Sequence, residues 1–336
     1  MSLYASEPTT SASIWVEQLL ACPRDHAALT VDGEKITCAE GHEYPFVDGI
    51  PILVLDDVAP TQPGYWAKPE QVAEARRRTA EAPPLASGEE VDPYVAELII
   101  GTHGNLYRKL AHGMSRYPIP DFPLPQGNGE LLLDIGCNWG RWSLAAARAG
   151  YKPIGIDPSF EAISFAKRIA EQLGATNVRY VVADGRHLPF APASLDIVFS
   201  YGVLQHFSKA DVRTSLRAIK AVLKPEGYSW IQMPNAFGLL SIARLAQRGF
   251  KEGEEFDVRY WRPGELKLAW AECIGPSTLT TDGFFTLNPQ KADLDLLPPH
   301  LRWIVLLSER LKSASARRPV LTNLADSVNV RSVPAK

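Results

Sequence analysis

Cysteine is scarce in this chain of 336 residues, which has four: Cys22, Cys38, Cys137 and Cys273. So few cysteines in a chain of this length do not make a disulfide scaffold, the device that small secreted domains use. Residues 1–10 are polar and have no signal-peptide pattern. These absences exclude the class of disulfide-rich secreted domains and favour a cytoplasmic protein.

Long apolar runs are also missing, and neither sign of charge dominates. No stretch of about 20 apolar residues occurs, so no membrane span is expected. The formal net charge of −3 gives no global attraction to nucleic acid or to an anionic membrane. Nucleic acid is therefore a disfavoured partner, although it is not excluded. The apolar fraction of 46% is sufficient for a large core.

Composition divides the chain into four parts. We expect a loose tail at 1–16, a strand-rich unit at 17–58, a linker with a helical cap at 59–125, and a large unit at 126–336. The large unit alternates strands and helices, which predicts an α/β fold with a parallel sheet and right-handed crossovers.

The large unit should hold seven strands, with the last pair antiparallel. The expected strands are 131–133, 153–156, 178–182, 196–200, 228–232, 278–285 and 327–333. The expected helices are 143–148, 161–173, 211–223 (stopped by Pro225 and Gly227), 263–273 and 301–311. An insertion at about 288–322 separates the last two strands.

A glycine-containing turn joins the first strand of this unit to its helix, with the sequence Leu132-Leu133-Asp134-Ile135-Gly136-Cys137-Asn138-Trp139-Gly140. Ligands in such sheets bind at the carboxyl ends of the strands, and glycines let the backbone approach them. Asp157 ends the second strand, where a carboxylate accepts ribose hydroxyls. These features alone fit a nicotinamide enzyme and an S-adenosylmethionine enzyme equally well.

Three details favour S-adenosylmethionine. The glycine spacing is not G-x-G-x-x-G, so the dinucleotide fingerprint is absent. Asp134 lies two residues before the first glycine, and Asp184 ends the third strand. Acidic strand ends suit a ligand with an amino group, ribose hydroxyls and an adenine amine, and they suit a pyrophosphate poorly.

Residues 130–235 resemble the class I S-adenosylmethionine-dependent methyltransferases, in particular those that act on small molecules. The resemblance rests on LLDIGCNWGRW, GIDPS, VVADGRHLPF, LDIVFSYGVLQHF and LKPEGY, in the family's order and spacing. It implies a Rossmann-like sheet and S-adenosylmethionine as the cofactor.

The resemblance also implies roles for single residues. Asp134 and Gly136 would lie near the amino-acid part of the cofactor. Asp157 would take the ribose hydroxyls, and Asp184 and Gly185 the adenine. Further candidate contacts are Cys137, Asn138, Gly140, Pro158 and Tyr201. Asn138 stands where the family usually has glycine, and Asn tolerates left-handed backbone. The alternative is that these residues only shape turns. This alternative applies best to Asp184, because Asp before Gly is common in turns.

The fourth strand ends beside the expected methyl group. Methyl transfer needs alignment and sometimes a base. His206 has a free pKa near neutrality and could be that base, but it could equally be structural. Tyr201 and Gln205 are candidate contacts. Tyr94, Tyr107 and Arg108 lie where an upstream helix would close over the cofactor.

The N-terminal cysteines resemble a zinc ribbon. The stretch Cys22-Pro23-Arg24-Asp25, followed by Cys38 and His42, resembles the ribbon of the activator partner of several tRNA and protein methyltransferases. A related ribbon is fused to a bacterial ribosomal RNA guanine methyltransferase. Asp25 stands where that pattern has cysteine, and zinc accepts Asp as a ligand. Either Cys22, Asp25, Cys38 and His42 hold a structural zinc ion, with His26 as a substitute for Asp25, or the metal was lost and the fold kept.

The expected function is transfer of a methyl group to an O, N or C atom of a small-molecule acceptor in metabolite biosynthesis. The residues that would form an apolar lid are Phe284, Phe285, Leu294, Leu297, Trp303 and Leu306, unless they complete the core. Two alternatives stay open: an RNA methyltransferase of the ribosomal guanine type, and a non-catalytic scaffold with this fold. A homodimer is also compatible with the sequence.

Overall fold

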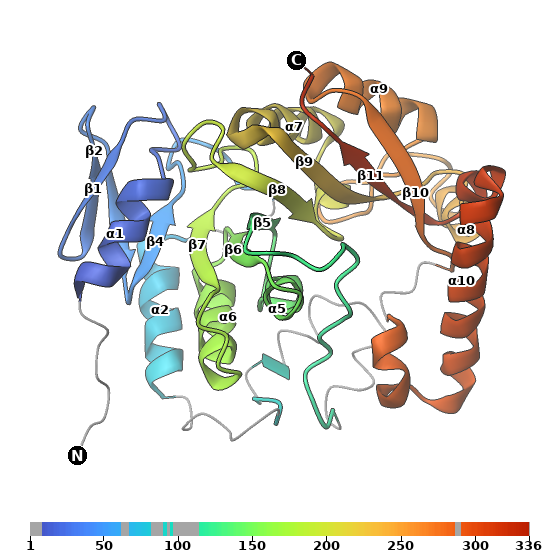
Figure 1. Cartoon of the computed structure of the whole chain (residues 1–336), viewed down its shortest axis with the longest axis horizontal. Helices are drawn as coiled ribbons and strands as arrows, with labels where there is room; N and C mark the ends of the chain where they lie inside the picture. The colour runs from blue at the N-terminus through green and yellow to red at the C-terminus, as the bar shows by residue number, and fades with distance from the viewer. Residues whose placement is uncertain are drawn as a thin grey trace.

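The large sheet carries the architecture of this protein. The computed structural model describes residues 9–61, 67–81, 90–92, 95–96, 114–285 and 290–335. In these residues eleven strands form one mixed sheet with the order β1-β2-β3-β4-β7-β6-β5-β8-β9-β11-β10 (Figure 1). The α/β fold predicted from the sequence is confirmed.

Seven of these strands belong to the predicted large unit. They are β5 (Leu131–Ile135), β6 (Lys152–Asp157), β7 (Arg179–Ala183), β8 (Leu195–Ser200), β9 (Leu223–Pro234), β10 (Ser277–Gly283) and β11 (Ser327–Ser332). Strands β5 to β9 run parallel, and β11 pairs antiparallel with both β9 and β10. The order places β5 at the topological switch point, where ligands of such sheets bind.

Helices connect these strands and cover both faces of the sheet. They are α5 (Arg141–Arg148), α6 (Phe160–Gln172), α7 (Lys209–Val222), α8 (Leu239–Gln247), α9 (Pro263–Cys273) and α10 (Pro299–Arg317). The short 3-10 turns are η2 (Leu204–His206), η3 (Lys291–Leu296) and η4 (Pro319–Leu324). Side chains of α5 and α6 pack on one face of the central strands, and those of α7 and α9 on the other. Burial on both faces explains why the central strands are continuous apolar runs.

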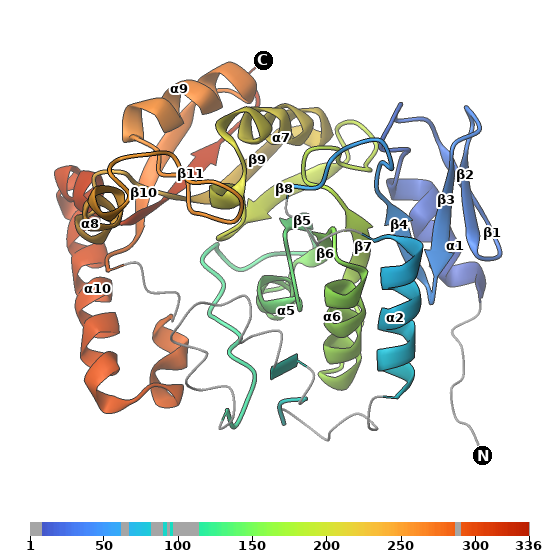
Figure 2. The same ribbon diagram turned by 180° about the vertical axis from the view of Figure 1, so that it is seen from behind.

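The N-terminal part extends the same sheet. It comprises α1 (Thr9–Leu19), β1 (Leu29–Asp32), β2 (Lys35–Cys38), β3 (Glu43–Val47), β4 (Ile50–Leu53) and α2 (Pro69–Ala80). Strand β4 pairs parallel with β7, with Ile52 opposite Val182 and Leu53 opposite Ala183. Figure 2 shows this part at one end of the molecule and α10 at the other.

Three sequence predictions differ from the structure. Residues 9–16 are not loose but lie in α1, because Val16 is buried in the core. Strand β9 starts at Leu223, so Pro225 and Gly227 lie inside a strand instead of ending a helix. Residues 114–118, which lie within the segment expected to carry the helical cap, are not helical.

Other predictions fall partly outside the described residues. About half of the linker and helical cap at 59–125 does so, and Tyr94, Tyr107 and Arg108 are among the residues that the structure does not describe. Among the described residues, no helix is long and apolar enough to cross a membrane.

Candidate functional site

Three buried carboxylates lie at the carboxyl ends of neighbouring parallel strands. Asp134 lies in β5, Asp157 ends β6, and Asp184 follows β7. Strand β6 pairs with both β5 and β7, so the three side chains share one edge of the sheet. The structure thus brings together the three acids that the sequence singled out.

Asp134 and Asp157 have no basic partner among the residues that the structure describes. Asp134 accepts a hydrogen bond from Ser143 Oγ at 2.7 Å, and burial raises its pKa to about 7. Asp157 accepts the N–H groups of Asn138 at 3.2 Å and Ser159 at 3.0 Å, and burial raises its pKa to about 6. Neither acid forms an ion pair within the described part of the chain. A ligand that brings ammonium or hydroxyl groups would complete their hydrogen bonding.

Asp184 differs because the chain supplies it with a cation. Both of its oxygens accept hydrogen bonds from Arg186, the shortest at 2.6 Å. Arg186 also pairs with Asp211 and donates to the carbonyl of Ala59. Each oxygen of Asp184 accepts two hydrogen bonds from Arg186, including one from its backbone N–H, so the charge of this carboxylate is already balanced. Its cofactor role therefore stays a prediction.

The turn between β5 and α5 requires its glycines. Gly136 and Gly140 have φ of 73° and 84°. A Cβ atom on Gly136 would lie 2.3 Å from Val203, and one on Gly140 would lie 2.5 Å from the Tyr180 hydroxyl. Neither position can take a larger residue without displacing a packed neighbour.

Asn138 occupies the left-handed region as expected, with φ of 50°. Its side-chain oxygen accepts the N–H of Trp139 at 2.7 Å, and its own N–H holds Asp157. Burial raises the pKa of the Cys137 thiol well above its ordinary value, which suits a loop residue and not a nucleophile. Pro158 is half-buried beside Asp157.

Tyr201, directly after β8, lines a small polar pocket. Its ring packs on Trp142 with the centroids 4.5 Å apart. Its hydroxyl donates to Asp282 at 3.0 Å and accepts from Gln290 at 3.1 Å. The pocket is lined by Tyr201, Asp282, Gly283, Gln290, Val305, Ser308 and Glu309. It therefore lies between the end of β8, strand β10 and helix α10.

His206 has both ring nitrogens engaged. Nδ1 lies 2.7 Å from the carbonyl oxygen of Phe256, so it must carry the proton that it donates. Nε2 then accepts from the Gln205 amide at 3.1 Å, and the ring stacks on Phe256. Burial lowers the pKa of His206 to about 4. This geometry suits a positioning residue, and a role as base stays a prediction.

A buried ion pair that was not predicted from the sequence fixes the insertion. Arg141, the first residue of α5, pairs with Asp293 of η3 at 3.0 Å, and both side chains are almost fully buried. Arg141 also donates to the carbonyl of Pro118 at 2.7 Å. The available signal was a cation in the first turn of a helix, where the helix dipole disfavours positive charge.

The residues proposed for an apolar lid differ in their exposure, so the lid stays a prediction. Phe284 and Leu297 are buried, but Trp303 and Leu306 are 58% and 42% exposed. Helix α10 therefore turns Val305, not Trp303 or Leu306, toward the pocket. The helical phase of this segment cannot be chosen from sequence because both faces of the helix carry apolar residues.

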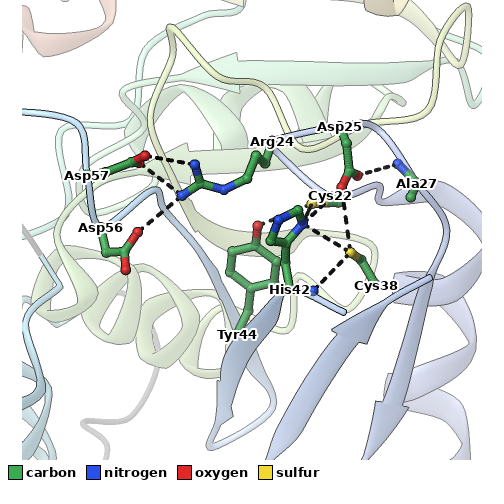
Figure 3. Close-up of polar contacts among 9 residues, drawn as sticks. All are labelled: Cys22, Arg24, Asp25, Ala27, Cys38, His42, Tyr44, Asp56 and Asp57. Carbon is green, nitrogen blue, oxygen red and sulfur yellow. Dashed lines mark hydrogen bonds and ion pairs between the residues drawn. The ribbon is translucent and has the colours of Figure 1, made fainter. Parts of the chain in front are cut away.

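The four candidate metal ligands converge at the N-terminal end of the sheet. Ligand atoms of Cys22, Asp25, Cys38 and His42 lie within 4.8 Å of one another (Figure 3). His42 Nδ1 lies 2.9 Å from the Asp25 carboxylate and 3.3 Å from Cys38 Sγ. His26, the proposed substitute for Asp25, is exposed and does not belong to this group.

Neighbouring contacts hold this group of ligands in place. Cys22 Sγ also meets the Tyr44 hydroxyl at 3.2 Å. Arg24 binds Asp56 and Asp57, which fixes the loop between the first two ligands (Figure 3). Two sulfurs, one nitrogen and one oxygen fit a tetrahedral zinc ion.

Comparison with known proteins supports the resemblance of the central segment to methyltransferases. The profile described as a methyltransferase domain matches residues 132–227. The ubiquinone biosynthesis O-methyltransferase of Cereibacter sphaeroides is 40% identical over 149 residues, 43% of this chain and 59% of that protein. The tRNA U34 carboxymethyltransferase of Desulfotalea psychrophila is 37% identical over 105 residues, 31% of this chain and 32% of that protein.

These matches are partial, since the chain spans about a third to three fifths of the length of these two relatives. A solved structure, the YcgJ protein of Bacillus subtilis, aligns with a TM-score of 0.41 at 17% identity, over 72% of this chain and 99% of that one. The profile match and the strand order agree on the residues that surround the three carboxylates. Residues 132–227 therefore form a class I S-adenosylmethionine-dependent methyltransferase domain, a family whose cofactor is S-adenosylmethionine.

Proposed function

We propose that this protein transfers a methyl group from S-adenosylmethionine to a small-molecule acceptor bound beside Tyr201. The observation that carries the proposal is the polar pocket at the carboxyl end of β8, walled by α10 and Gln290 of the insertion. The pairing of Arg141 with Asp293 ties that insertion to the glycine turn. The cavity has a volume of about 10 Å³, which is room for one water molecule, so the acceptor would lie at its mouth. Walls of β10 and α10 on two sides of that mouth suit a compact acceptor better than a polynucleotide.

The unpaired carboxylates support the proposed cofactor position. Asp134 and Gly136 would hold the amino-acid part, and Asp157 the ribose hydroxyls next to Pro158. Asp184 and Gly185 would border the adenine, with Asp184 held in place by Arg186. When bound, S-adenosylmethionine supplies an electrophilic methyl group. The protein then has to align the acceptor, exclude water and receive a proton where the acceptor releases one.

The pocket's side chains suggest how an acceptor would be held. Tyr201 and Gln290 offer hydrogen-bonding groups, and Asp282 and Glu309 add carboxylates. Carboxylates orient hydroxyl or amino groups by accepting their hydrogen bonds. Asp282 is fixed by Tyr201 and by Ser327 Oγ at 2.7 Å, so it is preorganised. We therefore favour an acceptor with hydroxyl or amino groups, in which O, N and C remain candidate acceptor atoms.

The RNA alternative has one specific observation in its favour, the similarity to a relative named for tRNA. A test is to incubate the full chain with methyl-labelled S-adenosylmethionine and either a metabolite extract or total RNA. We expect label in the low-molecular-mass fraction, and we expect Tyr201→Phe to reduce it while S-adenosylhomocysteine still binds. Label in RNA alone would replace the proposal by the RNA alternative. Absence of S-adenosylhomocysteine binding by calorimetry would favour the scaffold.

We also propose that Cys22, Asp25, Cys38 and His42 hold a structural zinc ion. The convergence of four suitable ligand atoms supports it. A set of four protein ligands leaves no open position for water or substrate, so the ion would stabilise the fold and not act in catalysis.

A further inference from the structure

Helix α8 has an unusual amount of exposed apolar surface. Leu239, Leu240 and Ile242 are 56%, 39% and 44% exposed, and Phe237 just before the helix is exposed as well. The helix has one buried side chain, Ser241, which bonds to Asp326. Soluble proteins rarely leave a contiguous apolar group of this kind in water without a function.

Two other elements continue this surface. The side chain of Asn235 donates to the carbonyls of Asn323 and Ala325, so η4 lies against the start of α8. η4 exposes Val320 and Leu324. Ten of the thirteen exposed large hydrophobic side chains of the described residues lie in the segments 237–251 and 299–324.

Helix α10 contributes a third apolar stripe. Trp303, Leu306 and Leu307 are exposed and, at spacings of three and four residues, share a face with Arg310. Figures 1 and 2 both place α8 and α10 at the same end of the molecule, opposite the N-terminal strands. We call the exposed side chains of 237–251 and 299–324 the apolar-basic surface.

The charge of this surface opposes that of the whole chain. Arg248 is half-buried and pairs with Asp257, and the two segments present six exposed basic side chains: Arg244, Lys251, Arg302, Arg310, Arg317 and Arg318. They contain one acidic residue, Glu309, which lines the pocket, whereas the full chain has a net charge of −3. Exposed leucine, phenylalanine and tryptophan next to arginine and lysine are typical of helices that lie in a membrane interface.

We propose that the apolar-basic surface docks on an anionic lipid bilayer, with α8 and the Trp303 face of α10 inserted at the headgroup level. Aliphatic side chains predominate in it, which favours acyl chains over nucleic acid, because nucleic acid selects stacked aromatics. A second copy of the chain would bring like charges together across the contact. The proposal is independent of the acceptor's identity, because it rests on this surface and not on the pocket.

The test is sedimentation of the full chain with vesicles of phosphatidylcholine, with and without phosphatidylglycerol. We expect binding to vesicles that contain phosphatidylglycerol, and we expect that binding to weaken as salt is raised. Arg244→Gln and Arg310→Gln should each weaken it about fivefold, the effect of one basic residue at such a surface. Leu239→Glu combined with Trp303→Glu should abolish it.

Matched controls separate docking from misfolding. Leu268→Glu changes an exposed leucine of α9, outside the surface, and Lys220→Gln removes an exposed cation of α7. Both should bind vesicles as the unchanged chain does, and all variants should keep the same melting temperature.

Three results would overturn the proposal. The first is equal binding, or none, with the two kinds of vesicle. The second is retention of RNA in a gel shift that the same variants abolish, without vesicle binding. The third is a dimer in sedimentation equilibrium that Leu239→Glu dissociates, again without vesicle binding.

Discussion

At the residue scale, Asp134 and Asp157 should couple cofactor binding to protonation. Burial holds their pKa values at about 7 and about 6, above the ordinary 3.8. The folded apo protein therefore binds more protons than the unfolded chain between pH 3.8 and about 7, and these two groups lower stability as pH rises through that window. A ligand that pairs with the ionised carboxylates must release those protons.

We therefore expect S-adenosylhomocysteine to bind more tightly as pH rises from 6 to 7, with release of protons. Calorimetry in two buffers of different ionisation enthalpy measures the release directly. Asp157→Asn should weaken binding and remove part of the proton release. Equal binding enthalpies in both buffers would show that the two acids do not change protonation.

His206 poses the second question at this scale. Its Nδ1–H donates to the carbonyl of Phe256, and an asparagine amide can donate from a similar position. We expect His206→Ala to reduce turnover by loosening the loop after β8, and His206→Asn to restore most of it. Steady-state kinetics at saturating S-adenosylmethionine measure both variants. Equal loss in the two, with cofactor affinity unchanged, would instead assign His206 as the base.

At the element scale, the buried pair of Arg141 and Asp293 should decide whether the insertion stays closed. Removing one partner of a buried ion pair costs about 3–5 kcal/mol, because the remaining charge loses a close counter-charge. We expect Asp293→Ala to lower the free energy of unfolding by about that amount, measured by urea denaturation. Asp295→Ala is the matched control, because it removes an exposed partner of Arg116 and should cost about 0–1 kcal/mol. Equal effects of the two substitutions would contradict this role.

The same scale shows how far the sequence determines the structure. Apolar periodicity predicts β5 to β8 within two residues at each end, and α9 with its observed bounds, because these elements bury the residues that their pattern marks. Helix α8 was not predicted, since its leucines are exposed and the pattern carries no information on what covers them. Asp293 could not be paired with Arg141 from sequence, because 152 positions separate them.

The candidate site also has a part that the sequence predicts and a part that it does not. Asp134, Asp157 and the glycines were predictable because strand ends and positive φ require those residue types. Two other features depend on the direction of side chains. Asp184 pairs with Arg186, and α10 turns Val305 instead of Trp303 toward the pocket. Spacing alone does not fix that direction, so the pocket's lining could not be written in advance.

At the scale of the whole molecule, the N-terminal strands and the cofactor edge form one connected structure. Strand β4 pairs with β7, the strand that precedes Asp184. Arg24 clamps Asp57 at 2.7 Å, and two residues further on the carbonyl of Ala59 accepts from Arg186, the partner of Asp184. Loss of structure around Cys22, Asp25, Cys38 and His42 can therefore displace Arg186 and Asp184, because the chain and these hydrogen bonds connect the two places.

This connection leads to a prediction for the metal. We expect stoichiometric zinc in the purified protein by elemental analysis, and we expect a chelator or Cys22→Ser to remove it. Loss of the ion should lower the melting temperature, because structural zinc contributes folding free energy. It should also weaken S-adenosylhomocysteine binding, since the contact between Ala59 and Arg186 would loosen. Cys273→Ser is the control, because this buried thiol lies outside the cluster. A protein that lacks zinc yet keeps its melting temperature and cofactor affinity would mean that hydrogen bonds among the four side chains suffice to hold the N-terminal strands against β7.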